Sequence, residues 1–139
     1  MGDKEGRGKY TYADGSTYEG DWEKNKIEGY GTQRWADGKQ YRGQWSLNYM
    51  HGYGFWMNAD KTEYVGQFSA DKKEGFGIYT WTDGRKYEGW WLKGKQHGFG
   101  TYTGSEGKGK YGIWNNGKRL RWIVDDRTVA YINEGNFAH

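Results

Sequence analysis

Apolar or small residues alternate with polar residues along short stretches of this 139-residue chain. The stretch 18–22 reads Tyr-Glu-Gly-Asp-Trp, which places Tyr18, Gly20 and Trp22 on one side and two acidic residues on the other. The stretch 75–81, Gly-Phe-Gly-Ile-Tyr-Thr-Trp, alternates in the same way. A period of two residues is typical of half-buried β-strands, so both stretches are predicted to be strands.

Two kinds of turn signal separate these predicted strands. One slot always holds a residue that tolerates a left-handed backbone, namely Asn25, Asn48, Asp71, Gly94 or Gly117. A second slot holds an acidic residue followed by glycine, a strong hairpin signal, at Asp14-Gly15, Asp37-Gly38, Asp83-Gly84 and Glu106-Gly107. The pattern therefore predicts a meander of antiparallel hairpins.

The strand and turn signals return every 23 residues. The stretch at 18–22 has counterparts at 41–45, 64–68 and 87–91, and a degenerate copy lies at 110–114. A fixed period of this size indicates a stacked array in which each unit contacts its neighbours. Aromatic residues make up 19% of the chain and aliphatic residues are scarce, so rings must supply most of the buried surface.

The pattern Tyr-Glu-Gly-x-Trp, then Gly-x-Gly, then Asp-Gly, resembles the MORN (membrane occupation and recognition nexus) repeat family. The predicted fold is all-β: an elongated, single-layer, twisted antiparallel sheet of tandem hairpins with a short C-terminal cap. The array is assigned to residues 1–123, with a partial repeat at 1–17, repeats beginning at residues 18, 41, 64 and 87, and a partial repeat from 110. Residues 124–139 are the cap or a linker. The resemblance implies a groove along one face and a role in scaffolding, membrane association or protein docking.

Three positions depart from the pattern. Lys61 stands where other turns have glycine, and a left-handed lysine costs about 1–2 kcal/mol. Phe68 replaces the usual Trp, and Gly104 occupies a slot that is elsewhere aromatic. We therefore expect a strained turn at Asp60-Lys61.

Aromatic residues recur in two slots at the second strand of each hairpin, and we expect them to line the groove. Tyr10, Trp56, Tyr79 and Tyr102 share one slot, and Tyr12, Trp35 and Trp81 share the next inward-facing slot. These rings either form only the structural face of the sheet or also receive a partner segment or helix. The favoured function is a non-catalytic interaction module that docks a protein partner in this groove. Self-association to a homodimer through terminal repeats is a related prediction.

Charge is distributed unevenly, although the net charge is only +3. Residues 89–124 carry seven Lys or Arg and a single acidic residue, whereas residues 1–88 are nearly balanced. The candidate lipid-binding residues are Lys93, Lys95, Lys118, Arg119 and Arg121. The alternative function is therefore direct binding of an anionic phospholipid such as a phosphoinositide. An ordinary solvated edge that blocks strand pairing is the other interpretation of these charges.

The sequence gives no support to catalysis. The chain has no cysteine, and His51 and His97 stand two repeats apart, about 20 Å. Turn chemistry explains the repeated aspartates. We predict no enzyme activity, no cofactor, no metal site and no nucleic-acid partner, because no such fingerprint is present.

Carbohydrate binding is a less favoured alternative, since Gly- and Trp-rich arrays with a shorter period bind cell walls. The sequence contains no recognisable signal peptide and no apolar run of membrane-spanning length. The expected location is cytoplasmic, either free or peripheral to a membrane or the cytoskeleton.

Overall fold

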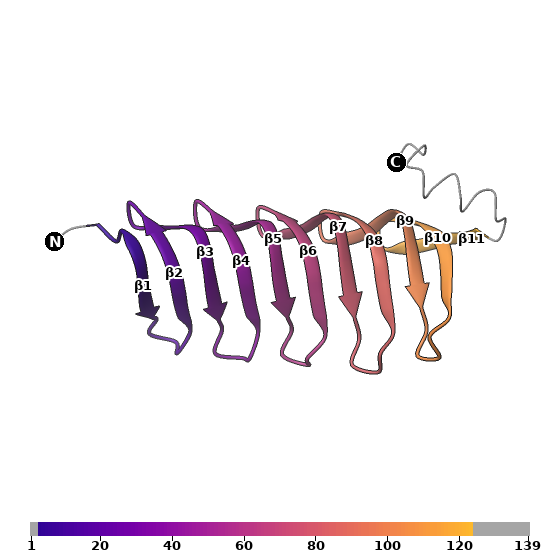
Figure 1. Cartoon of the computed structure of the whole chain (residues 1–139), viewed down its shortest axis with the longest axis horizontal. Coiled ribbons are helices and arrows are strands. Elements are labelled where there is room, and N and C mark those ends of the chain that lie inside the picture. The colour runs from indigo at the N-terminus through magenta and orange to yellow at the C-terminus, as the bar shows by residue number, and fades with distance from the viewer. Residues whose placement is uncertain (1–2, 124–139) are drawn as a thin grey trace. The chain divides into compact units, whose positions relative to one another are not determined.

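The computed structural model describes residues 3–123, and within them eleven strands follow one another in chain order in an antiparallel sheet (Figure 1). The strands are β1 (Gly6–Thr11), β2 (Thr17–Glu23), β3 (Lys26–Arg34), β4 (Gln40–Ser46), β5 (Tyr49–Met57), β6 (Glu63–Ser69), β7 (Lys72–Thr80), β8 (Lys86–Leu92), β9 (Lys95–Thr103), β10 (Gly109–Asn115) and β11 (Lys118–Ile123). The predicted all-β antiparallel sheet of hairpins is confirmed. The predicted cap at 124–139 lies outside the described residues.

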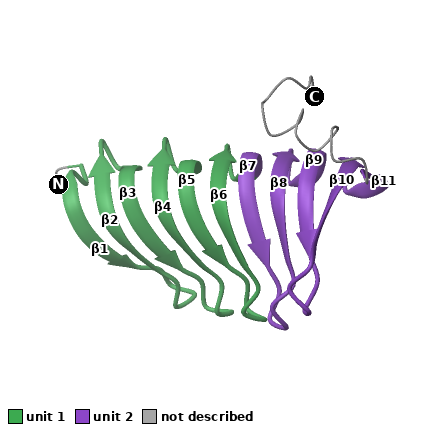
Figure 2. Ribbon diagram, turned by 45° about the vertical axis from the view of Figure 1, so that its right-hand side comes forward, with its two compact units in different colours: residues 1–72 green, residues 73–139 purple. Residues whose placement is uncertain are grey.

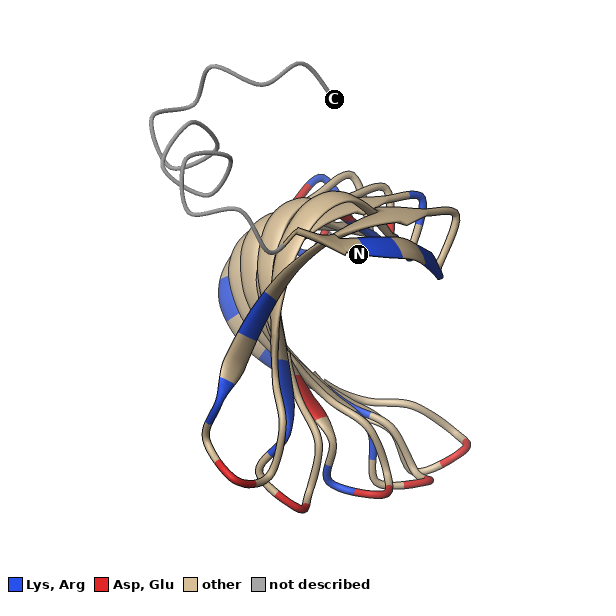
Figure 3. Cartoon of the chain, turned by 90° about the vertical axis from the view of Figure 1, so that its right-hand side faces the viewer, with Lys and Arg blue, Asp and Glu red and all other residues tan. Residues whose placement is uncertain are grey.

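The chain divides into two compact units, residues 1–72 and residues 73–139 (Figure 2). Unit 1 contains β1–β6, and unit 2 contains β8–β11 and all of β7 except its first residue, Lys72. Seen end-on, the strands of each unit are curved (Figure 3). Curvature crowds the side chains on the concave face of a sheet and splays them apart on the convex face.

Burial identifies the concave face of each unit. Residues paired across antiparallel strands project from the same face, so Tyr10 and its partner Tyr18 share one face, which we call the tyrosine face. The tyrosines that recur on this face every 23 residues have no exposed surface at all: Tyr18, Tyr41, Tyr64 and Tyr87. On the opposite face, Tyr30 and Tyr53 of unit 1 are 59% and 65% exposed, and Phe76 of unit 2 is 44% exposed. The crowded tyrosine face is therefore the concave one.

Three of the buried tyrosines, Tyr18, Tyr41 and Tyr87, each lie against a pair of glycines. Gly20 is paired with Gly31, and a Cβ atom at either position would collide with the phenol ring of Tyr18. The Tyr18 hydroxyl donates a hydrogen bond to the carbonyl oxygen of Asp21 at 3.0 Å. This ring covers glycines of its own hairpin, because the side chain extends along its own strand towards Asp21.

A second large ring sits between successive tyrosines. The ring centroid of Trp45 lies 5.6 Å from that of Tyr18 and 5.0 Å from that of Tyr41, edge-on to both. Its indole N–H donates to the carbonyl oxygen of Gly31 at 3.0 Å. Phe68 takes the equivalent place beside Tyr41, at 5.1 Å, and has no N–H to donate. The replacement of the usual Trp by Phe68 therefore preserves the ring packing but loses one hydrogen bond.

The tight turns link each hairpin to the one before it. The predicted left-handed slot is confirmed, with positive φ at Asn25, Asn48, Asp71, Gly94 and Gly117. The Asn48 N–H donates to the carbonyl oxygen of Ile27 at 3.0 Å, and the Asn48 side-chain oxygen accepts from the Ile27 N–H at 2.8 Å. In unit 2, the Gly94 N–H donates to the carbonyl oxygen of Lys73 at 2.9 Å. A glycine has no side chain, so Gly94 makes only one of the two hydrogen bonds that Asn48 makes. The Lys93 N–H adds a bond to the Glu74 carboxylate at 3.0 Å, as the Leu47 N–H does to Glu28 at 2.7 Å in unit 1.

The Asp60-Lys61 turn is left-handed at Lys61, as the sequence predicts. The φ angle of Lys61 is 75°, and the equivalent residues of the other turns, Gly15, Gly38, Gly84 and Gly107, also have positive φ. Asp60 accepts hydrogen bonds from the hydroxyl and the N–H of Thr62 at 2.7 and 3.0 Å, which lower the pKa of its carboxyl group. The aspartate of this slot thus has a turn-forming role.

A Lys61→Gly substitution should stabilise the protein by about 1 kcal/mol. It removes left-handed strain of about 1–2 kcal/mol, partly offset by the added backbone entropy of the unfolded chain. Thermal unfolding followed by circular dichroism would report the gain as a raised Tm. Lys61→Ala is the control, because it removes the same side chain but keeps a Cβ atom at positive φ, and it should bring no gain. An unchanged or lowered Tm for Lys61→Gly would refute the strain.

Candidate binding groove

The predicted groove residues lie on the concave tyrosine face. The cross-strand register places Tyr10 opposite Tyr18 and Tyr102 opposite Tyr87. Tyr10 is exposed, and the other six predicted rings are half-buried: Tyr12, Trp35, Trp56, Tyr79, Trp81 and Tyr102. These rings are fixed by neighbours on one side and open to solvent on the other.

In unit 1, Tyr12 and Trp35 border a hollow of about 370 Å³. The Trp35 ring packs against that of Trp56, with centroids 5.2 Å apart. The hollow is also lined by apolar side chains that the sequence analysis missed, Ile27, Trp45 and Met50. A signal for Trp45 was present, since it follows Tyr41 by four residues and so projects from the same face of the strand.

In unit 2, Trp81 packs beside Tyr79 and Tyr102, with ring centroids 4.8 and 6.2 Å away. A second hollow, of about 330 Å³, lies next to these rings. Its lining consists of Trp81, Gln96, Tyr102, Trp114, Arg119 and Trp122. Trp114 and Trp122 meet edge-on at 5.8 Å, and three of the six lining residues are tryptophans.

The 23-residue period alone would place Trp122 on the convex face. It shares a slot with five residues that occupy the middle of Gly-x-Gly: Arg7, Tyr30, Tyr53, Phe76 and Phe99. In those hairpins the slot follows a glycine, and Gly98, for example, has a φ of 83°. Arg121 stands at the glycine position before Trp122. The last hairpin therefore lacks the left-handed glycine of the others.

The register of β10 and β11 shows the effect of this replacement. Between its pairs Ile113–Arg121 and Trp114–Arg119, β11 holds one extra residue, Leu120. At the corresponding bulge between β8 and β9, the strand β9 holds two extra residues instead of one. Because a shift of one residue turns a side chain to the other face, Trp122 lies opposite Gly112 on the concave face.

The repeats match a known family at five places. The MORN repeat is found at residues 1–17, 18–40, 41–62, 64–84 and 87–109. The chain belongs to the MORN repeat family. A comparison with curated proteins finds no match. MORN repeats are generally interaction or membrane-associated modules, and the family is a non-catalytic one.

The matched MORN repeats end at residue 109, but the same packing continues in the next hairpin. Trp114 lies edge-on to Tyr87 with ring centroids 4.9 Å apart, as Trp45 does to Tyr18 in unit 1. The strands β10 and β11 therefore extend the aromatic face beyond the family match.

Three of the predicted lipid-binding residues of this MORN chain lie at neighbouring tight turns of unit 2. Lys93, Lys95 and Lys118 are exposed. The Gly117 N–H donates to the carbonyl oxygen of Gln96 at 2.9 Å, which joins the β10–β11 turn to the start of β9. The three lysines therefore share one edge of the sheet.

The two arginines of the predicted set take different directions. The guanidinium carbon of Arg119 lies 4.5 Å from the ring centroid of Trp122, at the groove. Arg121 is paired with Ile113, one residue away from Trp114 and Trp122, so it projects from the convex face. The structure therefore places the three lysines at one edge of the sheet, Arg119 at the groove and Arg121 on the convex face.

The described residues of the MORN array form neither a metal-binding cluster nor a membrane-spanning helix. Within residues 3–123, no group of three or more His, Asp or Glu side chains comes together as a metal ion would require. His51 instead accepts a hydrogen bond at Nδ1 from the N–H of Ala70, at 3.4 Å. The described part of the chain holds no helix of the length and apolarity needed to cross a membrane.

Proposed function

We propose that this MORN array docks an extended or helical segment of a protein partner along its concave aromatic groove. The proposal rests on a hollow on the concave face of each unit that is lined by buried and half-buried tryptophans. Its volume is about 370 Å³ in unit 1 and about 330 Å³ in unit 2. Among the described residues, no second layer covers this face. Rigid rings that are open on one side suit partner binding, because they bury large apolar area at low entropic cost.

The combined Trp35→Ala and Trp81→Ala variant should weaken partner binding by about tenfold or more, because an aromatic anchor typically contributes about 2 kcal/mol or more. Partners captured from extracts of the source cells would be quantified by mass spectrometry, and the affinity of each recombinant partner measured by calorimetry. A second copy of the chain is an eligible partner, which light scattering of the purified protein would reveal as a dimer.

The matched control is the pair Tyr30→Ala and Tyr53→Ala, which removes two exposed rings from the convex face of unit 1. This variant should bind the partner like the parent protein. Unweakened binding by a folded Trp35→Ala, Trp81→Ala protein would show that the groove is not the docking site.

Binding of an anionic phospholipid is a second candidate function. It is favoured by the hydrogen bond between Gly117 and Gln96, which brings two lysine-bearing turns to one edge. Replacing Lys93, Lys95 and Lys118 with Ser should abolish co-sedimentation with phosphoinositide vesicles, because each base contributes about 1 kcal/mol near an anionic surface.

A control for this experiment removes three exposed lysines at the tight turns of unit 1. Replacing Lys24, Lys26 and Lys72 with Ser changes the net charge equally and should leave pelleting intact. Pelleting of the parent protein should fall as salt is raised. Equal losses in the two variants, or pelleting that ignores salt, would count against a lipid site at the unit 2 edge.

A further inference from the structure

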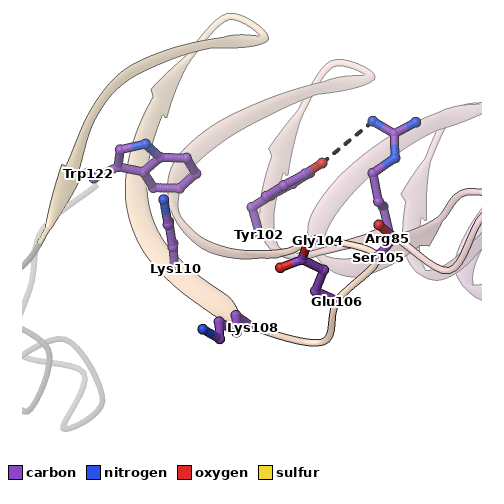
Figure 4. Close-up of a pocket in the computed structure, with 8 residues that line it drawn as sticks. All are labelled: Arg85, Tyr102, Gly104, Ser105, Glu106, Lys108, Lys110 and Trp122. Carbon is purple, nitrogen blue, oxygen red and sulfur yellow. Dashed lines mark hydrogen bonds between the residues drawn. The ribbon is translucent and has the colours of Figure 1, made fainter.

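Trp122 separates two hollows on the concave side of unit 2. One is the tryptophan-walled hollow described above, which also contains Arg119. The other, of about 570 Å³, lies on the side of the β9–β10 turn and is shown in Figure 4. Arg85, Tyr102, Glu106, Lys108, Lys110 and Trp122 contribute to its lining. Tyr102 and Trp122 border both hollows, so the two are adjacent subsites of one surface.

The second hollow carries excess positive charge. Lys110 points towards the indole of Trp122, with its Nζ atom 5.6 Å from the ring centroid (Figure 4). In the described part of the chain, neither Lys108 nor Lys110 has a carboxylate within ion-pair distance. Arg85 is already held, because it donates to Asp83 at 2.7 Å and to the Tyr102 hydroxyl at 3.5 Å. The two lysines are therefore the cations available to a ligand.

Arg119 adds charge on the other side of the same indole. Its guanidinium carbon and the Lys110 Nζ both lie over the Trp122 ring, at 4.5 and 5.6 Å from the centroid. Glu106 is the single acidic residue that lines either hollow. An occupant of this surface thus meets an apolar wall flanked by cations.

We propose that the segment docked in unit 2 presents an apolar side chain next to an acidic one. The apolar side chain fills the hollow beside Trp81 and Trp114, and the carboxylate lies between Lys108 and Lys110. This inference rests on the proposed docking function and specifies the chemistry of its partner: an acidic peptide segment with an aromatic or aliphatic residue beside the acid.

An acidic peptide fits this surface better than a membrane does. The hollow of about 330 Å³ is of a size to hold one large side chain, and the lysines stand beside it within the concave face. A flat bilayer reaches exposed edges and convex surfaces more readily than the inside of a curved sheet. Charge-assisted hydrogen bonds to a carboxylate also give the segment a fixed register in the groove.

The test is selection of a random displayed peptide library on the full chain. Peptides recovered on the parent protein are sequenced, and synthetic copies are titrated against two charge variants by calorimetry. The first variant is Lys108→Gln with Lys110→Gln. The matched control is Lys24→Gln with Lys26→Gln, which removes the same charge at a tight turn of unit 1. Trp81→Ala and Trp35→Ala report whether a peptide uses the groove of unit 2 or that of unit 1.

The expected result is a set of acid-rich peptides with one large apolar residue. The affinity of these peptides for the Lys108→Gln, Lys110→Gln variant should be about tenfold lower than for the parent protein, because a charged contact is lost. Their affinity for the control variant should stay within about twofold of the parent value. Trp81→Ala should weaken the same peptides. Folding of each variant is checked by Tm before titration.

Other results would overturn the inference in distinguishable ways. Peptides that need Trp81 but are not acidic, or that lose affinity equally in both charge variants, would leave docking standing and remove the acidic-partner inference. Peptides that ignore Trp81 and Trp35, or a selection that yields no binder, would count against docking itself. Binding of anionic vesicles that requires Lys108 and Lys110, with no acidic peptide recovered, would assign this surface to a membrane.

Discussion

A Gly54→Ala variant should be destabilised by about 3 kcal/mol, the upper end of the loss that overpacking typically causes. Gly54 is paired with Gly43, and the phenol ring of Tyr41 occupies the space into which the new Cβ atom would project. Gly54 does not have a positive φ, so the loss would come from overpacking and not from backbone strain. Tyr41 has no exposed surface and cannot simply rotate into solvent without giving up its burial.

Thermal unfolding measures this loss as a fall in Tm of about 10 °C. Gly104→Ala is the matched control, because nothing lies within 4 Å of the position of its Cβ atom and its φ is not positive. It should leave Tm within about 2 °C of the parent value. Similar losses for the two variants would show that the ring–glycine contact does not limit the side chain at position 54.

The second large effect is expected at alkaline pH, where the protein should lose stability by a few kcal/mol. Burial raises the pKa of Tyr18 to about 12 and also raises those of Tyr41 and Tyr87 above their ordinary value of 10. The folded state therefore favours the protonated phenols. Their contribution is complete below pH 10, the unfolded value, and is lost as the pH rises from there through the higher pKa of the folded state.

Urea unfolding at a series of pH values, with tyrosinate absorbance followed in parallel, would check this. Tyr41→Phe should reduce the alkaline loss, although it also removes the hydrogen bond that the Tyr41 hydroxyl donates to the Gln44 carbonyl at 2.7 Å. Tyr53→Phe, which removes the hydroxyl of a ring that is 65% exposed, is the control for the substitution itself. A flat pH dependence above pH 10 in the parent protein would contradict the role assigned to burial.

The hairpins and their turns could be predicted from sequence because each depends on a few adjacent residues. Alternation of apolar and polar residues identifies a strand, and Asn48 or Gly94 marks a left-handed turn, independently of distant parts of the chain. The sequence also groups the rings predicted to line the groove, including Trp35 and Trp81, in recurring slots, since the 23-residue period carries the strand register from repeat to repeat. In the structure these two rings line the hollow of unit 1 and that of unit 2.

The position of Trp122 could not be predicted from the period, because it depends on an irregularity in strand pairing. Arg121 replaces a glycine that the other hairpins hold at positive φ, and the smaller bulge that results reverses the side of the sheet on which Trp122 lies. The replacement is visible in the sequence. Its effect becomes clear only when the structure shows that those glycines, such as Gly98, belong to the bulge.

The links between tight turns have a consequence for cooperativity. Repeat arrays behave approximately as one-dimensional chains, in which each unit is coupled to its nearest neighbours. Asn48 couples two hairpins of unit 1 by a pair of hydrogen bonds, whereas Gly94 couples two hairpins of unit 2 by one. Local unfolding should therefore need less free energy in unit 2 than in unit 1. The hairpins affected in unit 2 are those that carry Trp81, Trp114 and Trp122. A ligand that bridges these hairpins would restore the missing coupling, so that binding and local order reinforce each other at this end of the array.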